Sequence, residues 1–175
     1  DMGFRNGPPK AGPWHHLAVV FDGVIERVYV DGQLNHAEAK MLLMHEGRPI
    51  HVGASEPGTE FLDGYLASLR LYDTALQETE VKRLAADEPS AEVLVHLDSA
   101  KLDYGPLTSW ENHGSLGGTF VGGDQAPVVE DVNGRIAVSF APGQSMVFTP
   151  QTEALSADFT LLLTLANPTS EPGEG

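Results

Sequence analysis

The stretch that decides the fold is WHHLAVVF, residues 14–21, followed by the turn signal Asp22-Gly23. Aliphatic, aromatic and β-branched residues dominate this run, as they do in β-strands. A second run, RVYV at residues 27–30, ends in Asp31-Gly32, a pair typical of a tight hairpin turn. Residues 14–35 are therefore predicted to form consecutive antiparallel strands.

Outward from this point, short apolar runs alternate with turn signals along most of the chain. Further strands are expected at residues 49–53, 61–72, 92–97, 119–121, 127–130, 136–140, 145–149 and 158–165. The run at 61–72 carries apolar residues at odd and even positions, so it is expected to be a central strand covered on both sides. Residues 36–44 fit either a short helix or a strand. The whole pattern predicts an all-β protein with an antiparallel β-sandwich.

One helix is expected within residues 74–86 (TALQETEVKRLAA), with its regular part near 76–86. Leu76, Val81 and Leu84 supply a partial apolar face, and acidic residues precede basic ones, as the helix dipole favours. Thr74 is a candidate for the N-cap. The residues that follow, Asp87-Glu88-Pro89-Ser90, predict the end of the helix and a linker.

The composition narrows the class of protein. The chain has 175 residues with 10 basic and 25 acidic side chains, a net charge of −15, and no cysteine. A surface this acidic repels nucleic acid and anionic membranes, so neither is an expected partner. The lack of cysteine excludes disulfides, thiolate zinc sites and cysteine nucleophiles. Because no apolar run approaches the roughly 18 residues of a membrane helix, membrane insertion is not expected.

The order of motifs between Trp14 and Val81 is specific. The tryptophan strand is followed by Tyr29-Val30-Asp31-Gly32, then by Phe61-Leu62-Asp63-Gly64, and finally by Ala75-Leu76 with Glu80-Val81. This succession resembles the C-terminal half of a laminin-G-like jelly roll of the concanavalin A-like lectin/glucanase superfamily. Residues 92–165, with the AVSF strand at 137–140, resemble the N-terminal half of such a domain.

The resemblance implies an antiparallel jelly-roll β-sandwich and a division of the chain. Residues 1–88 are expected to be the C-terminal half of one laminin-G-like jelly roll. Residues 89–175 are expected to be the N-terminal half of a second one, or a circularly permuted partner half, with a disordered tail at about 168–175. Either arrangement implies a larger multidomain parent chain.

The function that the resemblance implies is a non-catalytic recognition or cell-adhesion module of a larger secreted or surface-exposed protein. Its partner would be a glycan or an extracellular protein. Two alternatives remain open: an accessory domain of a secreted hydrolase or other enzyme, and a purely structural spacer. The superfamily's glucanases carry Glu-x-Asp-x-x-Glu on one strand, and because this chain lacks that motif, no catalysis is expected.

The candidate ligand-binding residues lie in one glycine-rich loop. Trp110 is the candidate aromatic platform for a carbohydrate, and Asn112 and His113 are its candidate polar partners. The glycines at 114, 117 and 118 would let the backbone approach a ligand closely. The alternative is that Trp110 covers the end of the sandwich, with its indole N–H bonded locally. Trp14 is expected in the core because it opens an apolar strand.

Calcium is the candidate cofactor, because laminin-G-like and lectin relatives bind it through loop oxygen ligands. The candidate ligands are carboxylates and one amide at predicted turns: Asp63, Asp98 and Asp124, then Asp103 and Asn112. The alternative is that these are solvated turn carboxylates, since no Asp-x-Asp-x-Asp run exists. His15 and His16 are neighbours on a strand, so they are expected to point to opposite faces and not to share a zinc ion.

Overall fold

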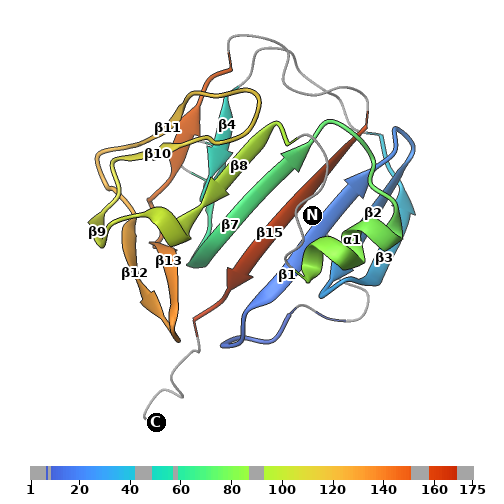
Figure 1. The fold of residues 1–175 in the computed structure, drawn as a ribbon, viewed down its shortest axis with the longest axis horizontal. Helices are drawn as coiled ribbons and strands as arrows, with labels where there is room; N and C mark the ends of the chain where they lie inside the picture. Colours follow the sequence, from blue (N-terminus) through green and yellow to red (C-terminus); the bar gives the residue numbers. More distant parts are fainter. Residues whose placement is uncertain are drawn as a thin grey trace.

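The structure, a computed structural model, describes residues 7, 9–41, 49–56, 59–86, 93–150 and 158–168. These residues form two sheets and a short hairpin (Figure 1). The strands are β1 (His15–Phe21), β2 (Ile25–Val30), β3 (Gln33–Ala39), β4 (Ile50–Val52), β5 (Ala54–Glu56), β6 (Thr59–Phe61), β7 (Gly64–Tyr72), β8 (Val95–Asp98), β9 (Gly105–Pro106), β10 (Ser109–Glu111), β11 (Thr119–Gly122), β12 (Val128–Val132), β13 (Arg135–Phe140), β14 (Met146–Phe148) and β15 (Phe159–Ala166). The helical elements described are α1 (Glu78–Ala85) and a 3-10 turn, η1 (Ser99–Lys101).

The large sheet joins strands from both ends of the chain. Its nine strands run in the order β3-β2-β1-β15-β7-β13-β12-β9, with β8 paired to β7 beside β13. β15 lies between β1 and β7 and pairs antiparallel with both (Figure 1). The central position expected for residues 61–72 is therefore confirmed for β7. The assignment of 1–88 and 89–175 to halves of two family domains stays a prediction, and residues 169–175 of the predicted tail lie outside the described residues.

The small sheet, in the order β10-β11-β14-β4, completes the sandwich. Its apolar side chains face those of β7, β8 and β13 and bury a shared core. Phe120 is 0 % exposed, and its ring lies 5.2 Å from that of Phe148, centroid to centroid. We call the side of the large sheet that faces this core the core face. The antiparallel β-sandwich predicted from the strand pattern is confirmed.

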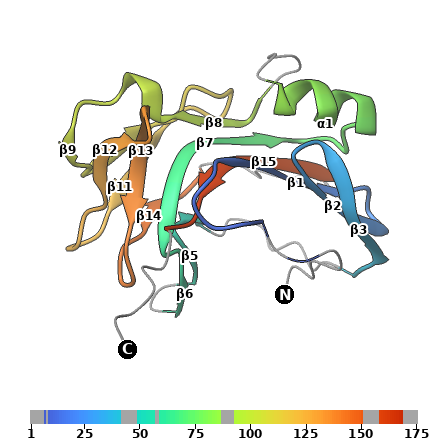
Figure 2. The ribbon, with the colours of Figure 1, turned by 90° about the horizontal axis from the view of Figure 1, so that it is seen from below.

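The opposite side of the large sheet is covered at one end by α1. Figure 2 shows α1 on the outer side of the arched sheet, with β5, β6 and β14 on the other side. Val81 and Leu84 of the helix are each 1 % exposed. They pack with alternate residues of the strands beneath: Ala18, Val20, Tyr29, Tyr72 and Leu162. We call this side of the large sheet the helix face.

The helix begins later than the sequence pattern predicted. Its first residue is Glu78, and Gln77 is the N-cap. The Glu80 carboxylate accepts a hydrogen bond from the Gln77 amide at 3.0 Å, as in a capping box. Thr74 is therefore not the N-cap, and its carbonyl instead accepts a hydrogen bond from the Thr160 hydroxyl at 2.8 Å.

The ambiguous segment 36–44 is resolved in part. Its first residues continue β3, which ends at Ala39, so the strand interpretation is confirmed that far. Residues 42–48 lie outside the described residues.

Candidate functional site

Trp110 does not present its ring to a ligand. It is 1 % exposed and belongs to the core between the two sheets. β10 turns the side chain inward, between exposed Ser109 and Glu111. An enclosed indole cannot stack on a sugar, so the expectation of an exposed aromatic platform at Trp110 is corrected by the structure.

The side-chain amide of Asn112 forms hydrogen bonds within the protein. The side chain is 4 % exposed, and its amide oxygen accepts hydrogen bonds from the amides of His96 and Gly114, both at 2.8 Å. Its amide nitrogen donates to the carbonyls of Leu94 at 3.2 Å and Gly117 at 2.9 Å. These four bonds use its donors and acceptors, so the role of Asn112 is to hold the loop. His113 remains exposed, and a ligand contact there stays a prediction.

The glycines of this loop serve internal packing. A Cβ atom at Gly114 would lie 2.3 Å from the Leu94 carbonyl oxygen, and one at Gly118 would lie 2.4 Å from the Phe148 ring. Gly118 also has a φ of +81°, which disfavours other residues. Close approach to the Leu94 carbonyl and to the Phe148 ring explains these two positions.

The candidate calcium ligands are dispersed. Asp98 lies opposite Ser68 in the sheet. Asp63 precedes Ser68 by five residues, which corresponds to roughly 17 Å along an extended strand, so Asp63 and Asp98 are far apart. Asp124 lies exposed in the connection between β11 and β12. Within the described residues, no three side chains of His, Asp or Glu lie together in a way that could hold a metal ion. Calcium binding stays a prediction without a site among these residues.

His15 and His16 point to opposite faces, as expected. His15 Nδ1 lies 2.8 Å from the Asp31 carboxylate, and its Nε2 lies 3.1 Å from the Lys10 carbonyl oxygen. His16 Nδ1 lies 3.2 Å from the Thr164 hydroxyl on the helix face. The pair therefore cannot bind one ion together.

A row of polar side chains crosses the helix face at the end that α1 leaves uncovered. The cross-strand register places His16 of β1 opposite Thr164 of β15, Thr164 opposite Ser68 of β7, and Ser68 opposite Asp98 of β8. The Ser68 hydroxyl donates to the Thr164 hydroxyl at 3.0 Å. Thr164 is only 4 % exposed, so this polar row sits within the sheet surface and not at its rim. Four adjacent strands thus present hydrogen-bonding groups in one line.

Two arginines border this polar row and enclose a pocket of about 260 Å³. Arg70 follows Ser68 on β7 by two positions, and Arg135 begins β13. The remaining lining comes from Ala67, Ser68, Asp98, Ser99, Ala100 and Thr164. Because β7 and β15 are central strands and η1 closes one side, the pocket has rigid walls. We call it the helix-face pocket.

Trp14, which was predicted to be in the core, instead lies beside this pocket. Trp14 is half-buried, and the Arg135 guanidinium carbon lies 5.2 Å from the centre of its ring. The indole N–H donates to the Val132 carbonyl at 3.4 Å. Trp14 precedes β1 and belongs to none of the core clusters of the described residues; it contacts Arg135 by a cation–π interaction instead.

His96 of β8 lies opposite Arg70 of β7. Burial lowers the pKa of His96, and the positive charge of Arg70 lowers it further, whereas Asp98 opposes this shift. His113 and Lys101 also lower the pKa of His96, so several basic side chains lie near this histidine.

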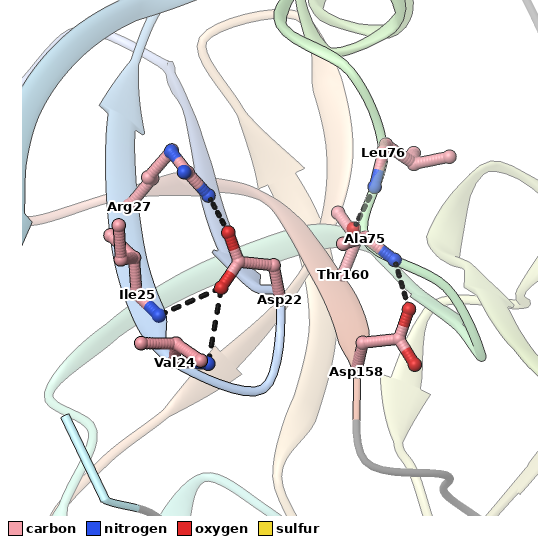
Figure 3. A network of polar contacts seen from close by, with 8 residues as sticks. All are labelled: Asp22, Val24, Ile25, Arg27, Ala75, Leu76, Asp158 and Thr160. Carbon is pink, nitrogen blue, oxygen red and sulfur yellow. Dashed lines mark hydrogen bonds and ion pairs between the residues drawn. The ribbon is translucent and has the colours of Figure 1, made fainter. Parts of the chain in front are cut away.

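A second hollow of about 260 Å³ opens near the start of α1, between the β1–β2 turn and residues 75–78. Figure 3 shows its polar groups. The Asp22 carboxylate accepts hydrogen bonds from Ile25 N at 2.7 Å and Val24 N at 3.1 Å, and it pairs with Arg27 Nη1 at 2.7 Å. The bond from Ile25, followed by those from Arg27 and Val24, lowers the pKa of Asp22 to about 2.

The other side of this hollow is held by β15 (Figure 3). The Thr160 hydroxyl accepts a hydrogen bond from Leu76 N at 2.9 Å, and Asp158 accepts one from Ala75 N at 3.4 Å. These polar groups therefore bind the protein's own backbone and fix the loop before α1. The helix-face pocket, with arginines that form no such bonds, is the better candidate for a ligand.

Sequence patterns did not identify the helix-face pocket. Ser68, Arg70 and Thr164 alternate with leucines on β7 and β15, and such alternation usually indicates a solvent-facing side of a strand. One signal was nevertheless present. Residues 61–72 were predicted to form a central strand, and polar residues at alternate positions of a central strand can indicate a functional site. Only the register of β15 between β1 and β7 brings the polar row together.

The antiparallel β-sandwich with a helix on its outer face defines the class of fold. Residues 4–82 match a laminin-G family model whose description is concanavalin A-like lectin/glucanases superfamily. This segment is therefore laminin-G-like, and the resemblance stated from its motifs is confirmed. No curated protein and no solved structure matches the chain significantly. In the part of the chain that the structure describes, no helix has the length and apolar character needed to cross a membrane.

Proposed function

We propose that this chain is a non-catalytic recognition module whose ligand binds in the helix-face pocket. The laminin-G-like segment supports a carbohydrate- or protein-binding module in general. The observation that carries the proposal is the polar row, of which Ser68 of β7, Asp98 of β8 and Thr164 of β15 offer hydrogen-bonding groups to an open pocket. Since fold alone does not define a function, this site is the necessary support.

The chemistry of the pocket favours binding over hydrolysis. Retaining glycosidases need two carboxyl groups about 5 Å apart. The lining of the helix-face pocket contains one carboxylate, Asp98, and its oxygen Oδ1 already accepts a hydrogen bond from Ala100 N at 3.0 Å. The absence of the Glu-x-Asp-x-x-Glu motif agrees with a non-catalytic role.

The proposal includes an extracellular or cell-surface location within a larger chain, with a glycan or an extracellular protein as the partner. It is supported by the typical location of laminin-G-like domains. The alternatives are an accessory domain of a secreted hydrolase and a structural spacer. An accessory domain would also bind a glycan, whereas a spacer would bind none.

A glycan array tests the proposal. The wild-type chain is compared with the double variant Ser68→Ala/Thr164→Val, which removes two hydroxyls of the polar row, and with Ser109→Ala, which removes an exposed hydroxyl on β10. We expect wild type and Ser109→Ala to bind the same glycans and the double variant to lose them. Repeating the array with EDTA tests calcium, and a reducing-sugar assay on the bound glycans tests hydrolysis. Equal glycan binding by all three proteins would contradict the assigned site.

A further inference from the structure

We propose that the helix-face pocket selects a carboxylated sugar residue, a uronic acid of a glycan, whose carboxylate binds between Arg70 and Arg135. This inference rests on the proposed function and adds the chemical class of the ligand. It starts from an imbalance of charge. The chain has 25 acidic and 10 basic side chains, yet two of its arginines line one pocket that contains a single carboxylate.

Arg70 and Arg135 are half-buried cations without an ion pair, whereas the other unpaired cations of the described residues, Lys10, Arg83 and Lys101, are exposed. Arg27 pairs with Asp22, Lys40 with Glu26, and Lys82 with Glu78. Within the described residues, neither Arg70 nor Arg135 forms an ion pair. Two cations held near each other repel, and an anion placed between them would relieve that repulsion.

Arg70 lines the pocket from the central strand β7. Its Nε atom is buried and the Tyr72 hydroxyl interacts with this side chain, so a ligand would meet the terminal N–H groups of the guanidinium. A carboxylate supplies two acceptor oxygens in the plane of the guanidinium, so it matches the geometry of an arginine better than a single hydroxyl does.

Arg135 is already positioned for a ligand. Its guanidinium lies over the Trp14 ring, with the carbon 5.2 Å from the ring centre, and the Trp14 indole is tied to the Val132 carbonyl. Stacking on an aromatic ring restricts the guanidinium while its N–H edges remain able to donate. Less freedom is then lost when an anion binds.

The rest of the pocket suits a sugar ring. The Ser68 and Thr164 hydroxyls are hydrogen-bonded to each other and retain further hydrogen-bonding capacity, and Asp98 has a second oxygen that can accept from a sugar hydroxyl. The volume of about 260 Å³ is below the roughly 300–1,000 Å³ of pockets for drug-sized ligands, so it fits one sugar residue. An acidic peptide would leave the polar row unmatched, so a glycan is the favoured source of the carboxylate.

The experiment uses the whole chain and five probes: glucuronic acid, galacturonic acid, the methyl ester of each, and the peptide Glu-Glu-Glu. Esterification removes the charge and keeps the ring. Trp14 fluorescence reports binding because Trp14 touches Arg135, whereas Trp110 is buried in the core. A Trp14→Phe variant identifies that signal, and NMR shifts of the arginine side chains provide a second readout.

We expect at least one uronic acid to bind about tenfold more tightly than its ester. The affinity for the acid should decrease as the salt concentration increases. Arg70→Gln and Arg135→Gln should each lose about tenfold in affinity, and Arg135→Lys should lose part of it, because lysine keeps the charge without the planar fork. Arg83→Gln, on the exposed side of α1, is the matched control and should bind like wild type. Urea unfolding verifies that each variant is folded.

Three results would overturn the inference: equal affinity for acid and ester, wild-type affinity in both glutamine variants, or tighter binding of the peptide Glu-Glu-Glu than of any uronic acid. The proposed function is judged separately. If the wild-type chain binds neutral glycans on the array and the Ser68→Ala/Thr164→Val variant does not, the recognition role is supported while the uronic acid assignment is wrong.

Discussion

The two ends of the helix face share β1, β7 and β15 but differ in chemical character. Under α1, Ala18, Val20, Tyr72 and Leu162 form an apolar surface that the helix buries. At the uncovered end, β1, β7 and β15 carry His16, Ser68, Arg70 and Thr164, and β8 and β13 add Asp98 and Arg135. The same face of one strand therefore changes from apolar to polar over a few residues.

Thr160 and Thr164 of β15 make this contrast within one strand. Both side chains lie on the helix face, and they are 0 % and 4 % exposed. The Thr160 hydroxyl accepts from Leu76 N and donates to the Thr74 carbonyl, so it fastens the loop before α1. The Thr164 hydroxyl contacts only side chains, those of Ser68 and His16, among the hydrogen bonds described.

The largest effect is expected from removing an apolar contact of the covered end. Leu84→Ala should lower the free energy of unfolding by about 2–5 kcal/mol, because Leu84 is 1 % exposed and its loss leaves a cavity beneath α1. Urea unfolding measures this change. Leu34→Ala, at a leucine that is 46 % exposed, is the matched control and should change stability little. Ligand binding should be the same in both variants. A loss of binding in folded Leu84→Ala would show that the two ends of the helix face are energetically coupled.

The threonine pair should separate stability from binding. Thr160→Val should cost about 1–3 kcal/mol of stability, because it leaves the buried Leu76 amide without an acceptor. Thr164→Val should cost less stability, since its side-chain partners can turn to other groups, but it should weaken ligand binding. Urea unfolding and glycan binding are measured for both. If Thr160→Val instead weakened glycan binding and left stability unchanged, the assignment of different roles to the two threonines would be wrong.

A smaller effect is expected at the start of α1. Glu80→Ala removes the acceptor of the Gln77 amide and should cost about 0.5–1 kcal/mol. Glu111→Ala, at an exposed residue of β10, is the matched control for the loss of one charge. Urea midpoints of the two variants give the difference, and equal midpoints would mean that the carboxylate does not stabilise the helix.

The smallest effect concerns pH. The folded state lowers the pKa of Asp22 from 3.8 to about 2, so its carboxylate stabilises the fold above about pH 4 and loses this effect as the pH falls toward 2. Asp22→Asn should therefore be less stable than wild type at pH 7, with the difference disappearing near pH 2. Carboxyl NMR titration of Asp22 measures the pKa directly. A value near 3.8 would show that the turn does not hold the carboxylate.

Much of the fold follows from local patterns. The turn pairs Asp22-Gly23 and Asp31-Gly32 and the alternating strands were sufficient to predict an antiparallel β-sandwich and the central position of β7. The helix start was wrong by a few residues, because Gln77 with Glu80 forms a cap that the usual preference for Ser or Thr does not identify. β9 and β10 were missed because strands of two or three residues carry too little pattern.

The candidate site was far less predictable. Trp110 was the candidate platform, with burial at the end of the sandwich as the alternative, and Trp14 was expected in the core; the structure buries Trp110 and leaves Trp14 half-buried. Trp110 is enclosed because its side chain lies in the core between the two sheets, whereas Trp14 precedes its strand and contacts Arg135 and the Val132 carbonyl. Neither environment depends on residues near the tryptophan in the sequence, so local pattern could not distinguish them.

The sequence by itself determined the strand pattern, the turns, the acidic charge and the laminin-G-like character, because these properties depend on residues close together in the chain. Only the tertiary structure decided which polar side chains meet. His16, Ser68, Asp98 and Thr164 belong to four strands and become neighbours when β15 pairs with β1 and β7. The register of long-range hydrogen bonds sets that arrangement, and with it the pocket in which we expect a ligand to bind.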